Sequence, residues 1–345
     1  MAARGDSEDD DALQHPRHTA TLVGHQAAED ALLEAYRAGR MPHAWLIGGP
    51  PGIGKATLAY RLARFVLAHP DPAAPAVQQA SSLHVDPEHR AFRRVAAQGH
   101  SDVLVLERVE NDKGRLQTVI TVDQVRRTVT FFGSTAGEGG WRVCIVDPVD
   151  DLNTNGLNAL LKILEEPPSR SLLLLVSHAP GRLPATIRSR CRRLAMRPLE
   201  ESDVLAVVTA ASGRAPDDPE MLAAVAAAEG SPGQALALLE GGLMKLRQKV
   251  STMLAALPAV DPLALHALGD EIAGSEPEPL HTLVDAVQDW LSERLEGGRQ
   301  EPRRLAQVAE VWDKIARAAR DAESYNLDRK PLVFSMFGWL AEAAR

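Results

Sequence analysis

Short apolar runs alternate with helical repeats along the first 198 residues. The apolar runs have strand length, are bounded mostly by Gly, Pro or charged residues, and predict strands at 44–48, 103–106, 142–146, 172–176 and 191–196. Apolar residues at helical spacing predict helices over 26–38, 55–67, 87–97, 122–131 and 157–164, and the glycine-rich segment 132–140 is expected to be a loop. Strands that alternate with helices predict a doubly wound α/β domain with a parallel sheet.

The pattern changes after Pro198, where strand-like runs stop. Residues 200–245 predict short helices, and residues 246–345 keep helical spacing with breaks near 257–262, 274–279 and 297–302. We therefore expect an acidic, disordered tail (1–18), the α/β domain (19–198), a small helical domain (199–247) and a helical bundle (248–345).

The net charge of the 345-residue chain is −8, whereas a protein that binds DNA on its own usually has a strong basic excess. A DNA-binding or nuclease module is therefore disfavoured. No apolar stretch approaches the ~20 residues that cross a membrane, and the N-terminus lacks the apolar core of a signal peptide, so we expect a cytoplasmic protein without membrane contact. Cys144 and Cys191 lie in or beside apolar runs and are expected to be buried, reduced thiols rather than zinc ligands.

A phosphate-binding loop is predicted between the first strand and the helix that begins at Lys55. The segment nearly fits the pattern G-x-x-x-x-G-K-[ST] and reads Gly49-Pro50-Pro51-Gly52-Ile53-Gly54-Lys55-Ala56. Its glycines let backbone N–H groups converge on phosphate oxygens, and Lys55 is placed to reach the β- and γ-phosphates. Ala56 stands where a hydroxyl should bind Mg²⁺, and Thr57 is rotated by about 100° around the helix. Binding of ATP or ADP is therefore weakly supported, and Mg²⁺ coordination is doubtful.

Asp147 ends the apolar run Val143-Cys144-Ile145-Val146 in the manner of a Walker B strand, and ligands of open α/β sheets bind at this edge. Pro148 follows, at a position where P-loop proteins that hydrolyse ATP usually have a glutamate that positions the attacking water. Asp150 and Asp151 lie further along the loop. The alternative interpretation of Asp147 is a carboxylate that caps a turn before a helix.

Two further stretches carry a family resemblance. They are Asn158-Ala159-Leu160-Leu161-Lys162-Ile163-Leu164-Glu165-Glu166-Pro167-Pro168 and Thr186-Ile187-Arg188-Ser189-Arg190-Cys191. With the glycine-rich loop and the Walker B strand, they resemble the clamp-loader branch of the AAA+ P-loop proteins, in which the second stretch is the SRC motif. The resemblance covers nearly the whole chain and implies a helical lid after the α/β domain and a C-terminal oligomerisation collar. The segment Tyr325-Asn326-Leu327-Asp328-Arg329-Lys330-Pro331-Leu332 resembles one subunit type of this family in particular.

The resemblance implies that Arg190 is an arginine finger, which points into a neighbouring subunit's ATP site and stabilises charge on the γ-phosphoryl group. The alternative is a surface arginine with a local salt bridge, and the other arginines around it are expected to be solvated or structural. Gly233 stands where relatives have the sensor-2 arginine, and the polar sensor-1 position falls at Ser177 or His178. Residues 68–100 contain no Cys, so the zinc module common in the family is missing or replaced.

Two hypotheses follow. In the first, the chain is a mechanical and regulatory subunit that supplies Arg190 in trans and hydrolyses little ATP, because Ala56, Pro148 and Gly233 are three defects in one site. Its implied partners are ATPase subunits and a delta subunit in a hetero-pentameric ring, the DNA polymerase III holoenzyme, the sliding clamp and primed DNA. In the second, intact Lys55 and Asp147 serve an active AAA+ ATPase, either a clamp-loader motor or a helicase-loader-like protein.

Overall fold

The computed structural model describes residues 15–109, 117, 119–133, 136–137, 140–239, 243–274, 278–296, 302–324 and 327–344. Two compact units divide the chain: residues 1–218 with 225–234, and residues 219–224 with 235–345. Most of the tail expected at 1–18 lies outside the described residues. Residues 15–18 are described as a turn, in which the backbone N–H of His18 donates to the His15 carbonyl at 2.8 Å.

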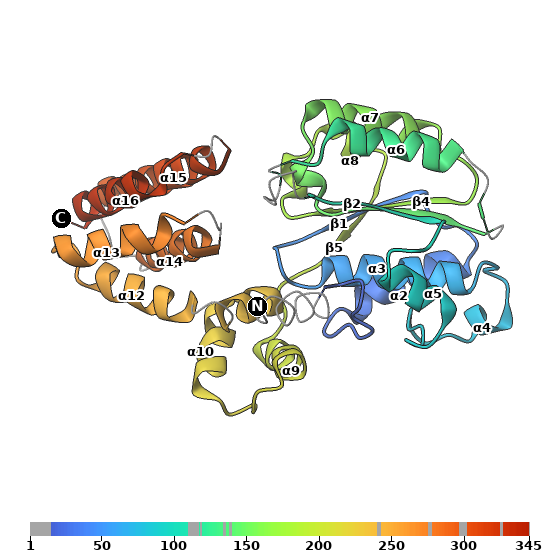
Figure 1. The fold of residues 1–345 in the computed structure, drawn as a ribbon, viewed down its shortest axis with the longest axis horizontal. Coiled ribbons are helices and arrows are strands. Elements are labelled where there is room, and N and C mark those ends of the chain that lie inside the picture. Colours follow the sequence, from blue (N-terminus) through green and yellow to red (C-terminus); the bar gives the residue numbers. More distant parts are fainter. Residues whose placement is uncertain are drawn as a thin grey trace, which may run out of the picture. The chain divides into compact units, whose positions relative to one another are not determined.

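A five-stranded parallel sheet forms the centre of the first unit (Figure 1). Its strands are β1 (Ala44–Gly48), β2 (Val103–Leu106), β3 (Arg142–Val146), β4 (Ser171–Ser177) and β5 (Arg192–Ala195). They are ordered β2-β3-β4-β1-β5, and every pair is parallel. All residues of β1, β3 and β4 are buried, as expected for parallel strands covered on both faces. The predicted α/β class and all five predicted strands are confirmed.

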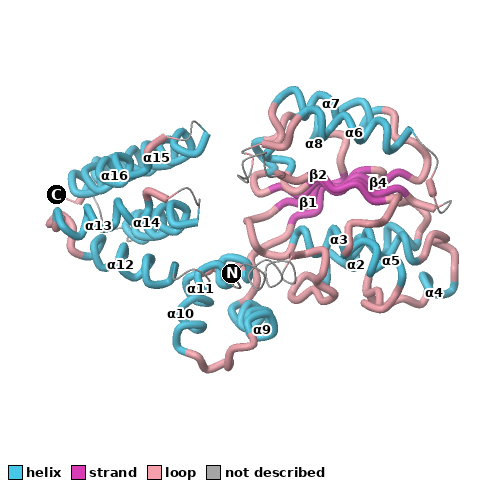
Figure 2. The backbone as a smooth tube through the Cα atoms, in the orientation of Figure 1, coloured by secondary structure: helices cyan, strands magenta, loops and turns pink. Residues whose placement is uncertain are grey.

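Helices cover both faces of this sheet, as Figure 2 shows most clearly. One layer contains α2 (Gln26–Arg37), α3 (Lys55–Ala68), α4 (Pro75–Gln78) and α5 (Arg90–Ala96), and the other contains α6 (Val122–Gly133), α7 (Thr154–Glu165) and α8 (Ala185–Arg188). The 3₁₀ turns η1 (Val149–Asp151) and η2 (Pro180–Arg182) follow β3 and β4. Each face has its own apolar core, and Cys144 and Cys191 are buried in the core beneath α6 and α7.

Helix ends differ from the sequence prediction where side chains cap them. Helix α7 begins at Thr154, three residues before the expected start at 157. Asn153 caps this helix, because its side chain accepts from the backbone N–H of Gly156 at 2.9 Å. The helix expected at 87–97 begins only at Arg90, since His89 in extended conformation caps it. The loop expected at 132–140 is helical as far as Gly133, and helix α4 was not predicted.

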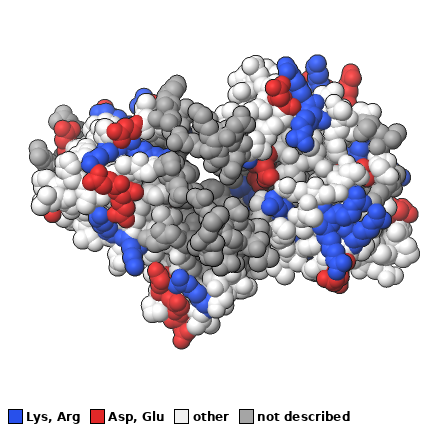
Figure 3. All heavy atoms as spheres, viewed as in Figure 1, with Lys and Arg blue, Asp and Glu red and all other residues white. Residues whose placement is uncertain are grey.

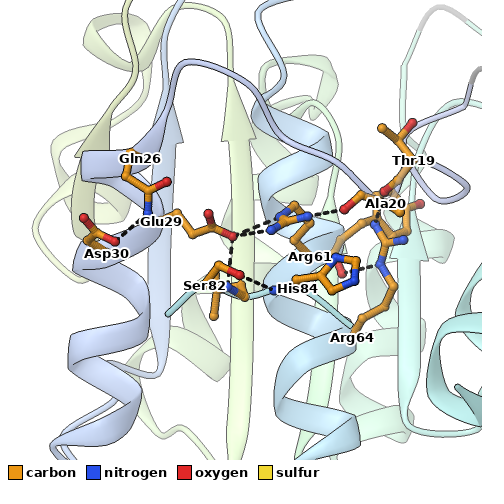
Figure 4. Close-up of polar contacts among 11 residues, drawn as sticks. Thr19, Ala20, Gln26, Glu29, Asp30, Arg61, Arg64, Ser82 and His84 are labelled. Carbon is orange, nitrogen blue, oxygen red and sulfur yellow. Dashed lines mark hydrogen bonds and ion pairs between the residues drawn. The ribbon is translucent and has the colours of Figure 1, made fainter. Parts of the chain in front are cut away.

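A buried polar cluster ties the N-terminal segment to the helix that follows the phosphate-binding loop (Figure 4). Glu29 of α2 accepts from Arg61 of α3, with Oε1 at 3.0 Å from Nε and 2.6 Å from Nη2, and the same oxygen accepts from the backbone N–H of Leu83 at 3.0 Å. Arg61 also donates to the Ala20 carbonyl. Arg64 donates to the Thr19 carbonyl at 2.8 Å. Residues 19–20 and α2 are thereby fastened to α3, and the segment around Leu83 is fastened to α2.

Short helices follow the sheet: α9 (Glu201–Ser212), α10 (Pro219–Ala227) and α11 (Pro232–Leu239). Residues 199–218 and 225–234 group with the α/β unit. The backbone N–H of Leu199 donates to the Gly230 carbonyl at 2.9 Å, which joins the end of the sheet to the segment before α11. The sequence predicted a separate helical domain at 199–247, and this domain boundary stays a prediction.

The second unit is a helical bundle that contains α12 (Leu243–Ala255), α13 (Pro262–Ile272), α14 (Glu278–Glu296), α15 (Pro302–Ser324) and α16 (Arg329–Ala343). Its core includes Val333, Met336, Phe337 and Leu340 of α16. Helix α16 packs against both α13 and α15. Asp328, in the C-terminal family-like segment, caps α16 by accepting from the backbone N–H of Lys330, whereas Tyr325 and Asn326 lie outside the described residues. In the described part of the chain, no helix has both the length and the apolar character required to cross a membrane.

Candidate functional site

The phosphate-binding loop connects β1 to α3 with a backbone that only glycine adopts readily. Gly52 and Gly54 have φ values of 71° and 96°, and Gly54 directly precedes the first residue of α3. Buried Lys55 donates from Nζ to the carbonyl of Pro50, within the same loop. Burial lowers the pKa of Lys55 to about 8, an effect opposed by the carboxylates of Asp147 and Asp150. The predicted strand–loop–helix arrangement is therefore present.

Strand order brings Asp147 to the same edge of the sheet as Lys55, with β4 between their strands. Asp147 lies at the end of β3, and its backbone N–H donates to the carbonyl of Leu106 at 2.9 Å. Burial raises the pKa of Asp147 to about 6; the nearby Glu107 carboxylate raises it further, whereas Lys55 and His15 oppose the rise. Asp147 therefore occupies the Walker B position predicted for it.

The acidic residues after Pro148 are engaged elsewhere. Asp150 accepts from the Ser177 hydroxyl at 3.0 Å and from the backbone N–H of His178 at 2.7 Å, so its carboxylate holds the end of β4. Asp151 pairs with Arg108, with its Oδ2 3.0 Å from Nε. Neither Asp150 nor Asp151 therefore replaces the water-positioning glutamate that is missing at position 148. Of the two sensor-1 candidates, Ser177 is buried and bonded to the Asp150 carboxylate, whereas His178 is exposed.

The segment before α11 packs directly on the loop. The backbone N–H of Gly233 donates to the Gly52 carbonyl at 3.0 Å, and the Ser231 hydroxyl donates to the Pro51 carbonyl at 3.0 Å. A Cβ on Gly233 would lie 2.9 Å from the Cα of Gly52. Sequence analysis recognised Gly233 only as a missing arginine; the structure shows that glycine is required there for two backbones to touch.

His25 is a contact to the loop that sequence analysis did not identify. Its Nε2 lies 2.7 Å from the carbonyl oxygen of Ile53, and its side chain is buried. Burial lowers the pKa of His25, which favours the neutral ring. A neutral ring with its proton on Nε2 donates this bond. No local pattern identifies such a residue, because its partner is 28 positions away.

Arg190 joins the two family-like motifs. It follows α8, and its Nη2 lies 2.9 Å from Oε1 of Glu165, the last residue of α7, while Nη1 donates to the Thr186 carbonyl at 2.9 Å. The side chain of Arg190 is 36% exposed. The local salt bridge considered as the alternative to a finger role is therefore present, and part of the side chain still faces solvent.

The side chains and backbone around the loop can be tested for their fit to a phosphate group and to Mg²⁺. The glycine backbone and Lys55 suit phosphate oxygens. Ala56 offers no oxygen, and Thr57, one step further along α3, is buried. The donor set therefore fits a phosphate group and does not fit the Mg²⁺ coordination of a hydrolytic P-loop enzyme. On the visible face of the first unit, Lys and Arg side chains gather over the helix layer that contains α3 and α5 (Figure 3).

Comparison with known proteins shows the family of this chain. The family model described as "DNA polymerase III, delta subunit" matches residues 24–200. The chain is 37% identical over 263 residues to the DNA polymerase III subunit delta' of Pseudomonas aeruginosa, covering 72% of this chain and 70% of the relative. It is 34% identical over 265 residues to the same subunit of Escherichia coli, covering 76% and 73%. A solved DNA polymerase III gamma subunit-related protein from Thermotoga maritima aligns with a TM-score of 0.45 and 17% identity, over 91% of this chain and 100% of that one. The chain belongs to the family of DNA polymerase III delta' subunits, in the clamp-loader branch of the AAA+ proteins.

Proposed function

We propose that this chain helps load the sliding clamp onto primed DNA by completing the ATP site of a neighbouring subunit, while hydrolysing little or no ATP itself. The observation that carries the proposal is the placement of Arg190. Its side chain is partly exposed, and Glu165 and the Thr186 carbonyl fix the direction of the guanidinium through Nη2 and Nη1. A pre-oriented cation of this kind suits the charge that develops on a transferred phosphoryl group.

The chain's own pocket supports the second half of the proposal. It lacks the metal-binding hydroxyl at Ala56 and the water-positioning carboxylate at Pro148. The sensor-2 arginine is replaced by Gly233, whose backbone is packed on Gly52. The three losses concern three separate parts of the hydrolytic machinery, so one compensating side chain does not restore turnover. The intact backbone and Lys55 are consistent with binding of ATP or ADP without hydrolysis.

The proposed assembly is a hetero-pentameric ring with the ATPase subunits and a delta subunit, within the DNA polymerase III holoenzyme. Contacts with the sliding clamp and primed DNA occur through this complex. The second unit is proposed as the collar through which the ring assembles, and its amphipathic helices with a continuous apolar core support this role. Deletion of residues 250–345 tests the collar assignment, because it should abolish assembly of the pentamer. An intact pentamer with the shortened chain would contradict the assignment.

Reconstitution of the loader with Arg190→Ala tests the finger. An arginine finger contributes about 10³- to 10⁵-fold to turnover at its site. We therefore expect the DNA-stimulated ATP hydrolysis of the complex to lose the part that the neighbouring subunit's ATP site contributes, while the complex still assembles. Arg190→Lys keeps the charge without the fork of donors and should restore little. The matched control is Arg192→Ala, an exposed arginine nearby on β5; an Arg190→Ala rate equal to that of this control would refute the finger role.

The alternative function, an active ATPase motor, rests on intact Lys55 and Asp147. It predicts ATP hydrolysis by the purified chain alone. Clear turnover that Lys55→Ala abolishes would establish this alternative and contradict the proposal of an inactive pocket. Turnover at background level in both proteins is the result that we expect.

A further inference from the structure

The segment that presents Arg190 is strongly cationic in a chain of net charge −8. Residues 178–199 contain no Asp or Glu and six arginines, which are Arg182, Arg188, Arg190, Arg192, Arg193 and Arg197. Segments of mixed charge balance themselves; this one does not. Its charge therefore requires either solvent or an external anion.

Most of these arginines form no ion pair within the described residues. Arg190 pairs with Glu165, whereas none of the other five has a carboxylate within 4.0 Å in that part of the chain. Arg188 is the most constrained, because its Nε is shielded from solvent and has no acceptor among the described groups. Arg192 and Arg193 are exposed on β5. This strand is at the end of the sheet order, and among the described strands it pairs only with β1.

Strand register separates Arg192 from Arg193. Arg192 is level with Trp45 of β1, and Arg193 is level with Leu46. Trp45 contributes to the core beneath α2, α3 and α5, whereas Leu46 contributes to the core beneath α6 and α7. Since paired residues of neighbouring strands point to the same face, Arg193 lies on the face that carries α8 and Arg190, and Arg192 lies on the opposite face.

We propose that Arg188 and Arg193 form, on either side of Arg190, a cationic docking surface for carboxylates on the neighbouring subunit. This inference rests on the proposed function, because a finger that acts in trans requires a neighbour against this face. The two arginines, here called the α8–β5 arginine pair, act before catalysis: they guide and hold the neighbour so that Arg190 reaches its phosphate. Complementary charge of this kind raises the association rate and fixes register.

An acidic protein surface is favoured over nucleic acid as the occupant. The two arginines flank Arg190 in the sequence, and the proposed target of Arg190 lies in a protein subunit. Arg193 also stands on β5, which is at the end of the described sheet, so one side of the backbone of that strand has no ladder partner there. Arginine forms bidentate pairs with carboxylates, and such pairs at an interface lose strength as salt concentration rises.

Binding of the full-length chain to its ATPase subunit, measured at 50 and 300 mM NaCl, tests the inference. The variants are Arg193→Glu alone and Arg193→Glu combined with Arg188→Glu. The control is Arg192→Glu, which has the same charge change as Arg193→Glu but lies on the opposite face of β5. At low salt we expect the double variant to weaken binding by about 10-fold or more, because like charges then face each other. Binding of this variant should no longer weaken as salt rises, because salt screens the repulsion. The control should stay within about twofold. Equal effects of Arg193→Glu and Arg192→Glu would overturn the inference.

Three further measurements separate the causes. Thermal unfolding identifies loss of fold, and Arg193→Gln, a milder change, should then give a smaller weakening in the same direction; binding unchanged by Arg193→Gln in a folded protein overturns the inference. Anisotropy with primed DNA addresses nucleic acid: a double variant that loses DNA binding but keeps subunit binding also overturns it. Arg190→Ala tests the proposed function alone. If Arg190→Ala leaves ATP hydrolysis unchanged while the double variant weakens assembly, the finger fails and the docking surface stands.

Discussion

Replacing Glu29 with Gln should destabilise the first unit strongly, although Glu29 is far from any proposed chemistry. The side chains of Glu29 and Arg61 are 5% and 6% exposed, so water cannot replace a lost partner. Gln keeps an oxygen for the Arg61 and Leu83 donors but leaves the Arg61 charge without a counter-charge. Breaking a buried pair by removing one partner costs about 3–5 kcal/mol, and because Gln keeps an acceptor we expect a loss of about 3 kcal/mol.

Urea unfolding at pH 7, followed by tryptophan fluorescence and by circular dichroism, measures this loss. Trp45 and Trp141 report on the first unit. The loss should change little between low and high salt, because a buried pair is poorly screened. The control is Glu34→Gln in the same helix, since Glu34 is 74% exposed and its Oε2 is 4.0 Å from Arg37 Nη1; we expect a change within about 0.5 kcal/mol there. A loss below about 1 kcal/mol for Glu29→Gln would refute the reasoning that this pair is shielded from water.

Two further predictions concern the phosphate-binding region. The folded-state pKa of Asp147 is about 6, above the ordinary value of 3.8, so the charged carboxylate destabilises the fold as pH rises through this window. Asp147→Asn should therefore stabilise the protein at pH 7 by about 1–3 kcal/mol and have no such effect near pH 3.5. Equal unfolding midpoints of the two proteins at pH 7 would contradict this. Gly233→Ala places a Cβ 2.9 Å from the Gly52 Cα, so either backbone must shift, and we expect about 1–3 kcal/mol lower stability in urea unfolding. Gly181→Ala, where a Cβ meets nothing within 4 Å, is the control, and a Gly233 variant no less stable than it would show that the contact is dispensable.

Most of the α/β architecture was predictable because its signals are local. Fully apolar runs such as Leu172–Val176 identify strands buried on both faces, and the segment from Gly49 to Lys55 identifies the loop between a strand and a helix. Errors occurred where a single side chain sets a helix end, as Asn153 does for α7. The periodicity of apolar residues carries no information about such a cap.

The candidate site was predictable in its residues but not in its contacts. Lys55 and Asp147 were expected at one edge, and strand order brings them there. The role of Arg190 was inferred from a motif, whereas its pairing with Glu165 requires α7 and α8 to pack side by side. His25 was missed altogether, because its link to Ile53 depends on how two segments fold together.

The sequence by itself determined the order of strands and helices, the phosphate-binding loop and the absence of a hydroxyl at Ala56 and a carboxylate at Pro148, because each is a property of residue type or short spacing. Only the tertiary structure decided that Gly233 must be glycine to contact Gly52, that Glu165 directs Arg190, and that Arg192 and Arg193 lie on opposite faces of β5. These features depend on distances of a few ångströms between segments far apart in the chain. Such distances are fixed by the packing of all the elements together.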